Sequence, residues 1–228
     1  MIFIRFSVII VLLIALFNNN LIFVKDLFSS SLSNKSEVDK LKLENDSLKT
    51  ELYIVENLSE KEVRYDKWEY LYSKIFSSYP FNNQNLISIN SGEKSGIKEN
   101  QAVAAAPGIL LGQIIKVNEN ISLVRTIFDK DFIAAVKIGE NKINALLKGG
   151  TPPILEMIEK SKDIKNGEIV YSSDQNFPYG FKLGEVQIIE NKDVDKAELF
   201  KKALLKTSYS LSSLEDVLII KNFEVLKK

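Results

Sequence analysis

Two clusters of polar residues are the best candidates for chemistry in this sequence. Asp129 and Asp131 lie two positions apart in "FDKD", and paired carboxylates can perform general acid–base catalysis. Ser172 and Ser173 precede Asp174, but the chain contains no histidine that could activate a serine. No S-x-x-K signature at a strand-to-helix step supports a Ser–Lys dyad. Because two aspartates in a turn are usually solvated or cap the backbone, we interpret Asp129 and Asp131 as turn residues, and we predict no catalytic group in either cluster.

A glycine-bearing stretch is the next candidate, because glycine-rich loops can bind phosphate. Four of the ten glycines lie in residues 89–117, "INSGEKSGIKENQAVAAAPGILLGQIIKV". A phosphate loop places its glycines at the start of a helix, whereas Gly92 and Gly96 are followed by strand-like alternation. Gly108 and Gly112 lie inside that strand pattern. We therefore predict turns, bends and close backbone contacts, with a positive φ at Asn100.

The composition excludes several classes of function. Cysteine and histidine are both absent, which excludes cysteine–histidine zinc sites, cysteine nucleophiles and triads with a histidine base. The 30 basic and 30 acidic residues cancel, so no overall charge favours nucleic acid. We expect no cofactor, no metal and no nucleic-acid partner.

The first residues predict a membrane anchor. A single charge, Arg5, precedes an apolar run from Phe6 to Phe17, and the flanking apolar residues extend the run to the length of a span. No small-x-small cleavage site follows, so residues 1–24 are predicted to be an uncleaved transmembrane signal anchor rather than a cleaved signal peptide or a buried core helix. Arg5 favours a cytoplasmic N-terminus, with the chain after Lys25 outside the cytoplasmic membrane.

Residues 25–78 are predicted to be a linker and a coiled-coil helix, helical from Lys35 to Phe76. The first 79 residues of the chain contain neither glycine nor proline. A heptad repeat indicates a dimerisation seam, after which the pattern shifts register. The alternative is a lone helix packed on its own domain. The predicted seam residues are Val38, Leu41, Asn45, Leu48, Leu52 and Val55.

Residues 79–228 are predicted to be a β domain. All the glycines and prolines lie between Pro80 and Gly184, and about nine short alternating or apolar runs are separated by turn clusters. This pattern is typical of antiparallel barrels or a sandwich. Residues 193–210 include Leu199, Phe200, Ala203 and Leu204 at helical spacing, which leaves a short helix and an edge strand as alternatives.

Taken in order, the chain resembles the rod shape-determining protein MreC family over nearly its whole length. The resemblance is carried by "SGEKSGIKENQAVAAAPGILLGQIIKV", "SLVRTIFDKDFIAAVKI", "IKNGEIVYSSDQNFPYGFKLGEV" and the terminal "LSSLEDVLII". Asn100 stands where the family usually has glycine, Glu168 where it has aspartate, and Ser173–Asp174 where it has Ser-Gly. The resemblance implies a mainly β fold, with two small six-stranded β-barrels on a dimeric helix that follows a transmembrane helix.

The resemblance also implies a non-enzymatic scaffold of the elongation machinery, which maintains cell shape by organising peptidoglycan synthesis enzymes. The implied partners are a second copy of the chain, MreD, the MreB system, RodA and a class B penicillin-binding protein. The alternative is a periplasmic adaptor of an export system, whose coil is usually a helical hairpin rather than a single pass. A third class, a chymotrypsin-like hydrolase, has no histidine to use.

Overall fold

The computed structural model describes residues 35, 37–52, 69–76, 85–189 and 199–221. The chain forms two compact units, residues 1–41 and 42–228, and every described strand belongs to the second. None of the helices in the described ranges is long and apolar enough to cross a membrane. The predicted anchor, residues 1–24, lies outside these ranges.

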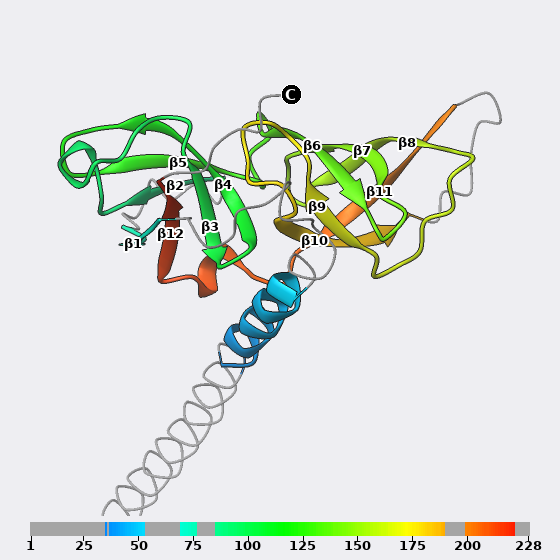
Figure 1. Ribbon diagram of the computed structural model, residues 1–228, viewed down its shortest axis with the longest axis horizontal. Helices are drawn as coiled ribbons and strands as arrows, with labels where there is room; N and C mark the ends of the chain where they lie inside the picture. The colour runs from blue at the N-terminus through cyan, green and yellow to red at the C-terminus, as the bar shows by residue number, and fades with distance from the viewer. Residues whose placement is uncertain (1–34, 36, 53–68, 77–84, 190–198, 222–228) are drawn as a thin grey trace, which may run out of the picture. The chain divides into compact units, whose positions relative to one another are not determined.

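The described residues contain a helix over 37–52, followed by strands and two short 3-10 turns (Figure 1). The 3-10 turns are η2 (Glu93–Ser95) and η3 (Leu211–Ser213). The strands are β1 (Tyr70–Lys74), β2 (Leu86–Ile89), β3 (Ala102–Ala106), β4 (Ile109–Val117), β5 (Ser122–Thr126), β6 (Ile133–Ile138), β7 (Ile143–Lys148), β8 (Ile154–Glu159), β9 (Ile169–Ser172), β10 (Lys182–Ile188), β11 (Phe200–Lys206) and β12 (Asp216–Ile220).

Six of the strands close into a ring, here called the closed barrel. They pair in the order β6-β7-β8-β11-β10-β9, and β9 pairs again with β6. All six pairings are antiparallel. Closure leaves no strand edge in the ring exposed, which removes the usual site of edge-to-edge aggregation. The prediction of a mainly β fold with a six-stranded barrel is thus confirmed.

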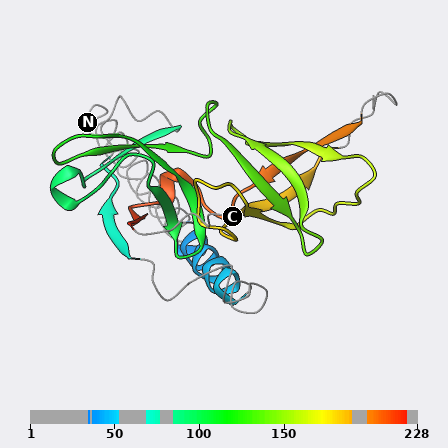
Figure 2. The same cartoon turned by 45° about the horizontal axis from the view of Figure 1, so that its top comes forward.

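The other six strands, here called the first strand group, pair in the order β1-β12-β3-β4-β5-β2. An isolated antiparallel bridge between Ile75 and Ile89 joins the segment after β1 to β2. One parallel pairing, Lys182 with Ile109, connects β10 of the closed barrel to β4. Figures 1 and 2 show the two groups of strands from two directions.

Alternation of side chains explains why these segments form barrel strands. In β6, Ala134, Val136 and Ile138 are buried, while the residues between them are partly exposed. In β4, the residues Ile109 to Leu111 are all buried, as a strand paired on both sides and covered requires. A period of two places every second side chain in the interior, which is the pattern that the sequence shows.

Three predictions about local structure are wrong. The helix does not continue to Phe76, because Tyr70–Lys74 is strand β1, paired with β12 in register from Tyr70↔Ile220 to Lys74↔Asp216. This strand lies before the predicted start of the β domain at residue 79. Gly108 lies in the β3–β4 turn, with a φ of 74°, and not inside a strand.

Of the segment 193–210, for which the sequence leaves two alternatives, residues 199–210 lie within the described ranges. Phe200–Lys206 is strand β11, which pairs with β8 on one side and β10 on the other, so it is neither a helix nor an edge strand. Its helical spacing of apolar residues is overridden by the two partner strands. Strand β3, whose four alanines give little strand signal, was not among the predicted runs.

Candidate interaction site

The hydroxyl of Ser172 is not available as a nucleophile. The side chain is buried, with 1% of its surface exposed, and Oγ donates a hydrogen bond to the carbonyl of Pro178. The same Oγ accepts a hydrogen bond from the backbone N–H of Phe181 at 3.0 Å. Ser172, the last residue of β9, therefore binds the backbone of the loop between β9 and β10.

Asp129 and Asp131 do not form a carboxylate pair aimed at a common site. Asp129 is buried, and its Oδ1 accepts the backbone N–H of Asp131 at 2.9 Å, while Asp131 is exposed. This is the local side-chain-to-backbone bond that aspartate makes in turns. The prediction of turn residues is confirmed at this position.

The glycine-bearing stretch near β3 and β4 makes close backbone contacts and turns, and it does not form a phosphate site. A Cβ atom on Gly92 would lie 2.2 Å from the carbonyl oxygen of Asn118, so the two chain segments touch without room for a side chain. The N–H groups of Glu93 and Lys94 donate to the carbonyls of Asn118 and Glu119. These donors are therefore occupied and do not face a phosphate. Asn100 has a φ of 70°, as predicted.

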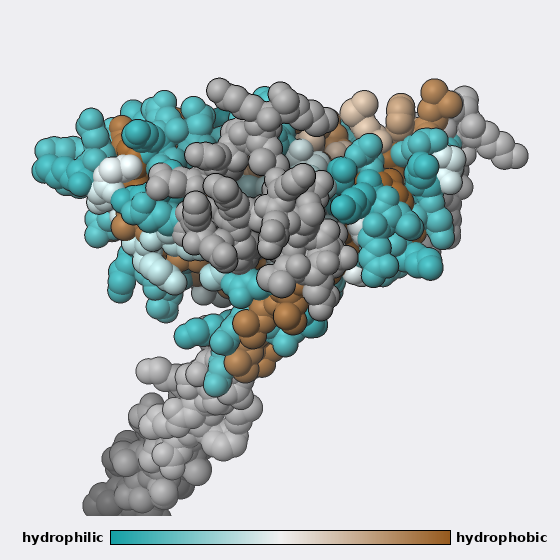
Figure 3. Space-filling view, in the orientation of Figure 1, coloured by the Kyte–Doolittle hydropathy of each residue, from teal (hydrophilic) through white to brown (hydrophobic). Residues whose placement is uncertain are grey.

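The described part of the predicted seam is exposed. Leu48 and Leu52 are 56% and 60% exposed. Figure 3 shows apolar surface, in brown, on this stretch of helix. The described seam residues are Val38 (46% exposed), Leu41 (58%), Asn45 (exposed), Leu48 and Leu52; Val55 lies outside the described residues.

The opposite face of the helix packs on the strands, and it is mostly polar. Ser47 and Thr50 are 6% and 2% exposed, and Leu43 packs against the core. Ser47 Oγ donates to the carbonyl of Pro107 at 2.6 Å, and Thr50 Oγ1 donates to the helix carbonyl of Asp46 at 2.7 Å. Steps of three and four residues place this face about half a turn away from Leu48 and Leu52. The helix therefore packs on the strands through one face and leaves the described seam residues on the other face exposed.

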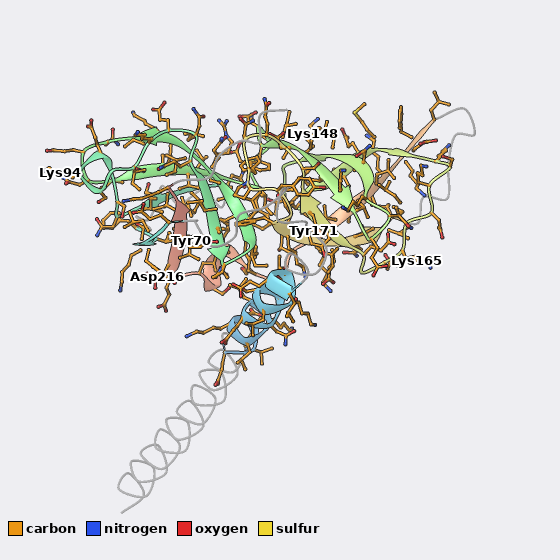
Figure 4. The ribbon with its side chains drawn as sticks, viewed as in Figure 1. Tyr70, Lys94, Lys148, Lys165, Tyr171 and Asp216 are labelled. Atoms are coloured by element: carbon orange, nitrogen blue, oxygen red, sulfur yellow. The ribbon has the colours of Figure 1, made fainter. Side chains whose placement is uncertain are left out.

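The end of the described helix lies near β1. Burial raises the pKa of the Tyr70 phenol above its usual value, and the carboxylate of Glu51 adds to the rise. Figure 4 labels Tyr70 on β1 and Asp216 on β12, two strands that pair with each other. The helix thus contacts the β3–β4 turn through Ser47, and the charge of Glu51 acts on β1.

The comparisons with known proteins match this fold. The family model described as "Rod shape-determining protein MreC, barrel core" matches residues 75–221, which is more than half of the chain. The chain belongs to the MreC family. The match contains β2 to β12 and ends one residue after β12, so it covers nearly all of the strands described above.

Among its relatives, the cell shape-determining proteins MreC of Bacillus subtilis and Geobacillus stearothermophilus are each 26% identical over 202 residues. The alignments cover 82% of this chain and 66% of those relatives, so the chain spans just under two thirds of their length.

Two solved structures illustrate the shared fold. A structure of MreC from Listeria monocytogenes is 20% identical, with a TM-score of 0.62 over 90% of this chain and 97% of that one. The crystal structure of MreC from Pseudomonas aeruginosa is 26% identical, with a TM-score of 0.55 over 67% of this chain and 99% of that one. The likeness of the first, below 25% identity, concerns the fold alone.

A third similar structure contains an MreC protein together with a second protein. It is described as a complex between penicillin-binding protein PBP2 and MreC from Helicobacter pylori, and it has a TM-score of 0.52 at 20% identity. It covers 68% of this chain and all of that one.

The sequence located the outward face of the helix but not the face that packs on the strands. Ser47 and Thr50 look like ordinary solvent-facing residues of a coiled coil, because they occupy heptad positions away from the seam. The one available signal is that both are small and uncharged in a helix whose neighbouring positions carry charge.

Proposed function

We propose that this chain is a non-enzymatic, membrane-anchored scaffold that maintains cell shape by organising peptidoglycan synthesis enzymes. The observation that carries the proposal is the family match over residues 75–221, since its members are named for determining cell shape. The candidate catalytic groups of this chain support it, because Ser172 and Asp129 are engaged in backbone hydrogen bonds. Nothing in the described residues favours the export-adaptor alternative.

Membrane attachment is part of the proposal. Residues 1–24 would form a single-pass anchor in the cytoplasmic membrane, with the remainder of the chain on its outer, periplasmic or extracellular side. The apolar run from Phe6 to Phe17 supports this arrangement.

The helix would join two copies of the chain. Its exposed leucines at heptad spacing support a coiled-coil homodimer, because a partner helix would remove their apolar surface from water. Asn45 at a seam position would favour a low oligomer number and a fixed register. The part of residues 25–78 that precedes β1 would then act as a spacer between membrane and strands.

The strands would present two small barrels to partner proteins. The closed barrel is one of them, and the bridge between Ile75 and Ile89 supports closure of the first strand group into a second. By family resemblance the partners would be MreD, the MreB system, RodA and a class B penicillin-binding protein. The PBP2 complex formed by the H. pylori relative supports the last of these.

The experiment that tests the proposal is depletion of this protein in its own cells, with cell shape followed by microscopy. Elongated cells are expected to become round and swollen while protein export continues. A second strain should carry a copy that lacks residues 1–24, which is expected not to restore shape. Unchanged shape after complete depletion, or restoration by the unanchored copy, would count against the proposal.

A further inference from the structure

One lysine in the described part of the chain has its ammonium group almost completely buried. Lys182 is 2% exposed, and its side chain 3%. A buried ammonium is costly unless it is paired and hydrogen-bonded, so its partners determine whether the site is stable.

Two carboxylates from different parts of the chain surround this ammonium. Asp46, on the helix, places Oδ2 at 2.9 Å from Nζ, and Glu185, three residues along β10, places Oε1 at 3.1 Å. The two carboxylates differ in their setting, because the side chain of Asp46 is 15% exposed and that of Glu185 is 40% exposed. Screening by water weakens the pair with Glu185 more than the pair with Asp46.

The same lysine lies where three elements meet. Its backbone N–H donates to the carbonyl of Gly108 at 2.8 Å, in the β3–β4 turn. The preceding carbonyl, that of Pro107, accepts the hydroxyl of Ser47 on the helix at 2.6 Å. Two consecutive carbonyls of one turn thus bind the helix and β10, while the lysine ammonium binds the helix again.

We propose that Lys182 is a positioning residue whose pairing with Asp46 fixes residues 42–52 of the helix on the strands. The ion pair is the only charged contact between the helix and the closed barrel among the described residues. Its carboxylate is one helix position away from Ser47, so both contacts act on the same turn of helix. This inference does not depend on the proposed scaffold function.

The chemistry of the site explains why one pairing dominates. If the Asp46 carboxylate is removed, the buried ammonium keeps only the more exposed Glu185, and the structure must admit water to hydrate it. The easiest way to admit water is to lift the helix, because the helix is held there by few other polar contacts than the Ser47 hydrogen bond. If the Glu185 carboxylate is removed instead, the Lys182 ammonium keeps its pair with Asp46. The helix then does not need to move to admit water.

Distances between spin labels in the full chain test this directly. The chain has no cysteine, so single cysteines can be introduced and labelled without background. Lys42→Cys provides a label on the helix, Lys94→Cys one on the first strand group and Lys165→Cys one on the closed barrel; Figure 4 labels Lys94 and Lys165 at exposed positions. Dilution with unlabelled protein removes distances between copies.

In the otherwise unchanged chain, the helix-to-strand distances between residues 42 and 94 and between 42 and 165 are expected to form one narrow population each. Asp46→Asn is expected to add a second, longer population to both. Glu185→Gln, the matched control that removes the other carboxylate, is expected to leave both distributions unchanged. The distance between residues 94 and 165 should stay the same in all variants.

Three results would overturn the proposal. Unchanged distributions in Asp46→Asn would show that the ion pair does not hold the helix. Equal broadening in Glu185→Gln would remove the special role of Asp46. A simultaneous change between residues 94 and 165 would show that the pair stabilises the strands as a whole and does not act only on the position of the helix.

Discussion

The phenol of Tyr209 donates a hydrogen bond to the backbone carbonyl of Leu110 at 2.9 Å, although 99 positions separate the two residues. Tyr209 follows β11 of the closed barrel, and Leu110 lies in β4 of the first strand group. The ring of Phe128 meets that of Tyr209 edge-on, with centroids 6.2 Å apart. Burial raises the pKa of the phenol, so it stays protonated and able to donate at all ordinary pH values. The connection that returns the chain to β12 is thus anchored on β4.

Tyr209→Phe is expected to lower the free energy of unfolding by about 1–3 kcal/mol. The phenyl ring keeps its packing, but the buried carbonyl of Leu110 loses its donor. Urea unfolding followed by fluorescence measures the change. Tyr72→Phe is the matched control, because Tyr72 is 73% exposed, and a change within about 0.5 kcal/mol is expected there. Equal effects in the two variants would contradict the role given to the hydrogen bond.

Gly112→Ala is expected to destabilise the protein by about 3 kcal/mol or more, because the added Cβ would overpack the β4–β5 pairing. That atom would lie 2.0 Å from the carbonyl oxygen of Arg125, which is backbone and cannot move aside alone. Gly167→Ala provides the comparison, since no atom lies within 4 Å and only its φ of +84° is unfavourable. About 1–2 kcal/mol is expected for that strain. Thermal unfolding measures the stability of both variants. A larger loss of stability in Gly167→Ala than in Gly112→Ala would refute the close-contact explanation.

Glu156 is expected to make the stability of the closed barrel depend on pH in the acid range. Lys202 on β11 donates to its Oε1 at 2.9 Å, and this hydrogen bond holds the pKa of Glu156 below its usual value, although some burial opposes the shift. A carboxyl group with a lowered folded-state pKa stabilises the fold above its unfolded pKa, and this contribution is lost as pH falls through the folded value.

The difference in unfolding free energy between the unchanged protein and Glu156→Gln should therefore be largest above the unfolded-state pKa of glutamate, about 4.3, and should decrease as the pH falls through the lower pKa of the folded state. The same comparison in a Lys202→Gln background is expected to show much less pH dependence. Pulse proteolysis over a pH series measures both. A difference that persists unchanged at low pH would refute the assignment.

Replacing the exposed leucines Leu41, Leu48 and Leu52 by glutamine is expected to abolish self-association while the strands stay folded. These side chains do not contribute to the buried core, so their loss removes only what a partner helix would cover. Sedimentation of the purified protein measures the oligomeric state, and circular dichroism confirms the strands. Lys49→Gln, on the same exposed stretch of helix, is the control and should sediment like the unchanged protein. Identical profiles for the triple variant would mean that the dimer uses another surface.

The sequence alone was sufficient to predict the elements with a strong local signal. Alternating runs such as the one from Ile133 to Ile138 indicated strands, and the leucines at heptad spacing indicated the outward face of the helix. The turn roles of Asp129 and Asn100 also followed from local chemistry, since each depends on the residue's own backbone. Periodicity and turn chemistry act over a few residues, which is why they can be read without a structure.

Only the tertiary structure decided which segments pair. Tyr70–Lys74 and Phe200–Lys206 carry helix-like spacing, yet each becomes a strand because partner strands distant in sequence supply its hydrogen bonds. In the same way, Ser47 and Lys182 are polar residues that a sequence places in solvent. Their burial follows from the contact of the helix with the β3–β4 turn and β10, and no local pattern encodes a contact between such distant parts of the chain.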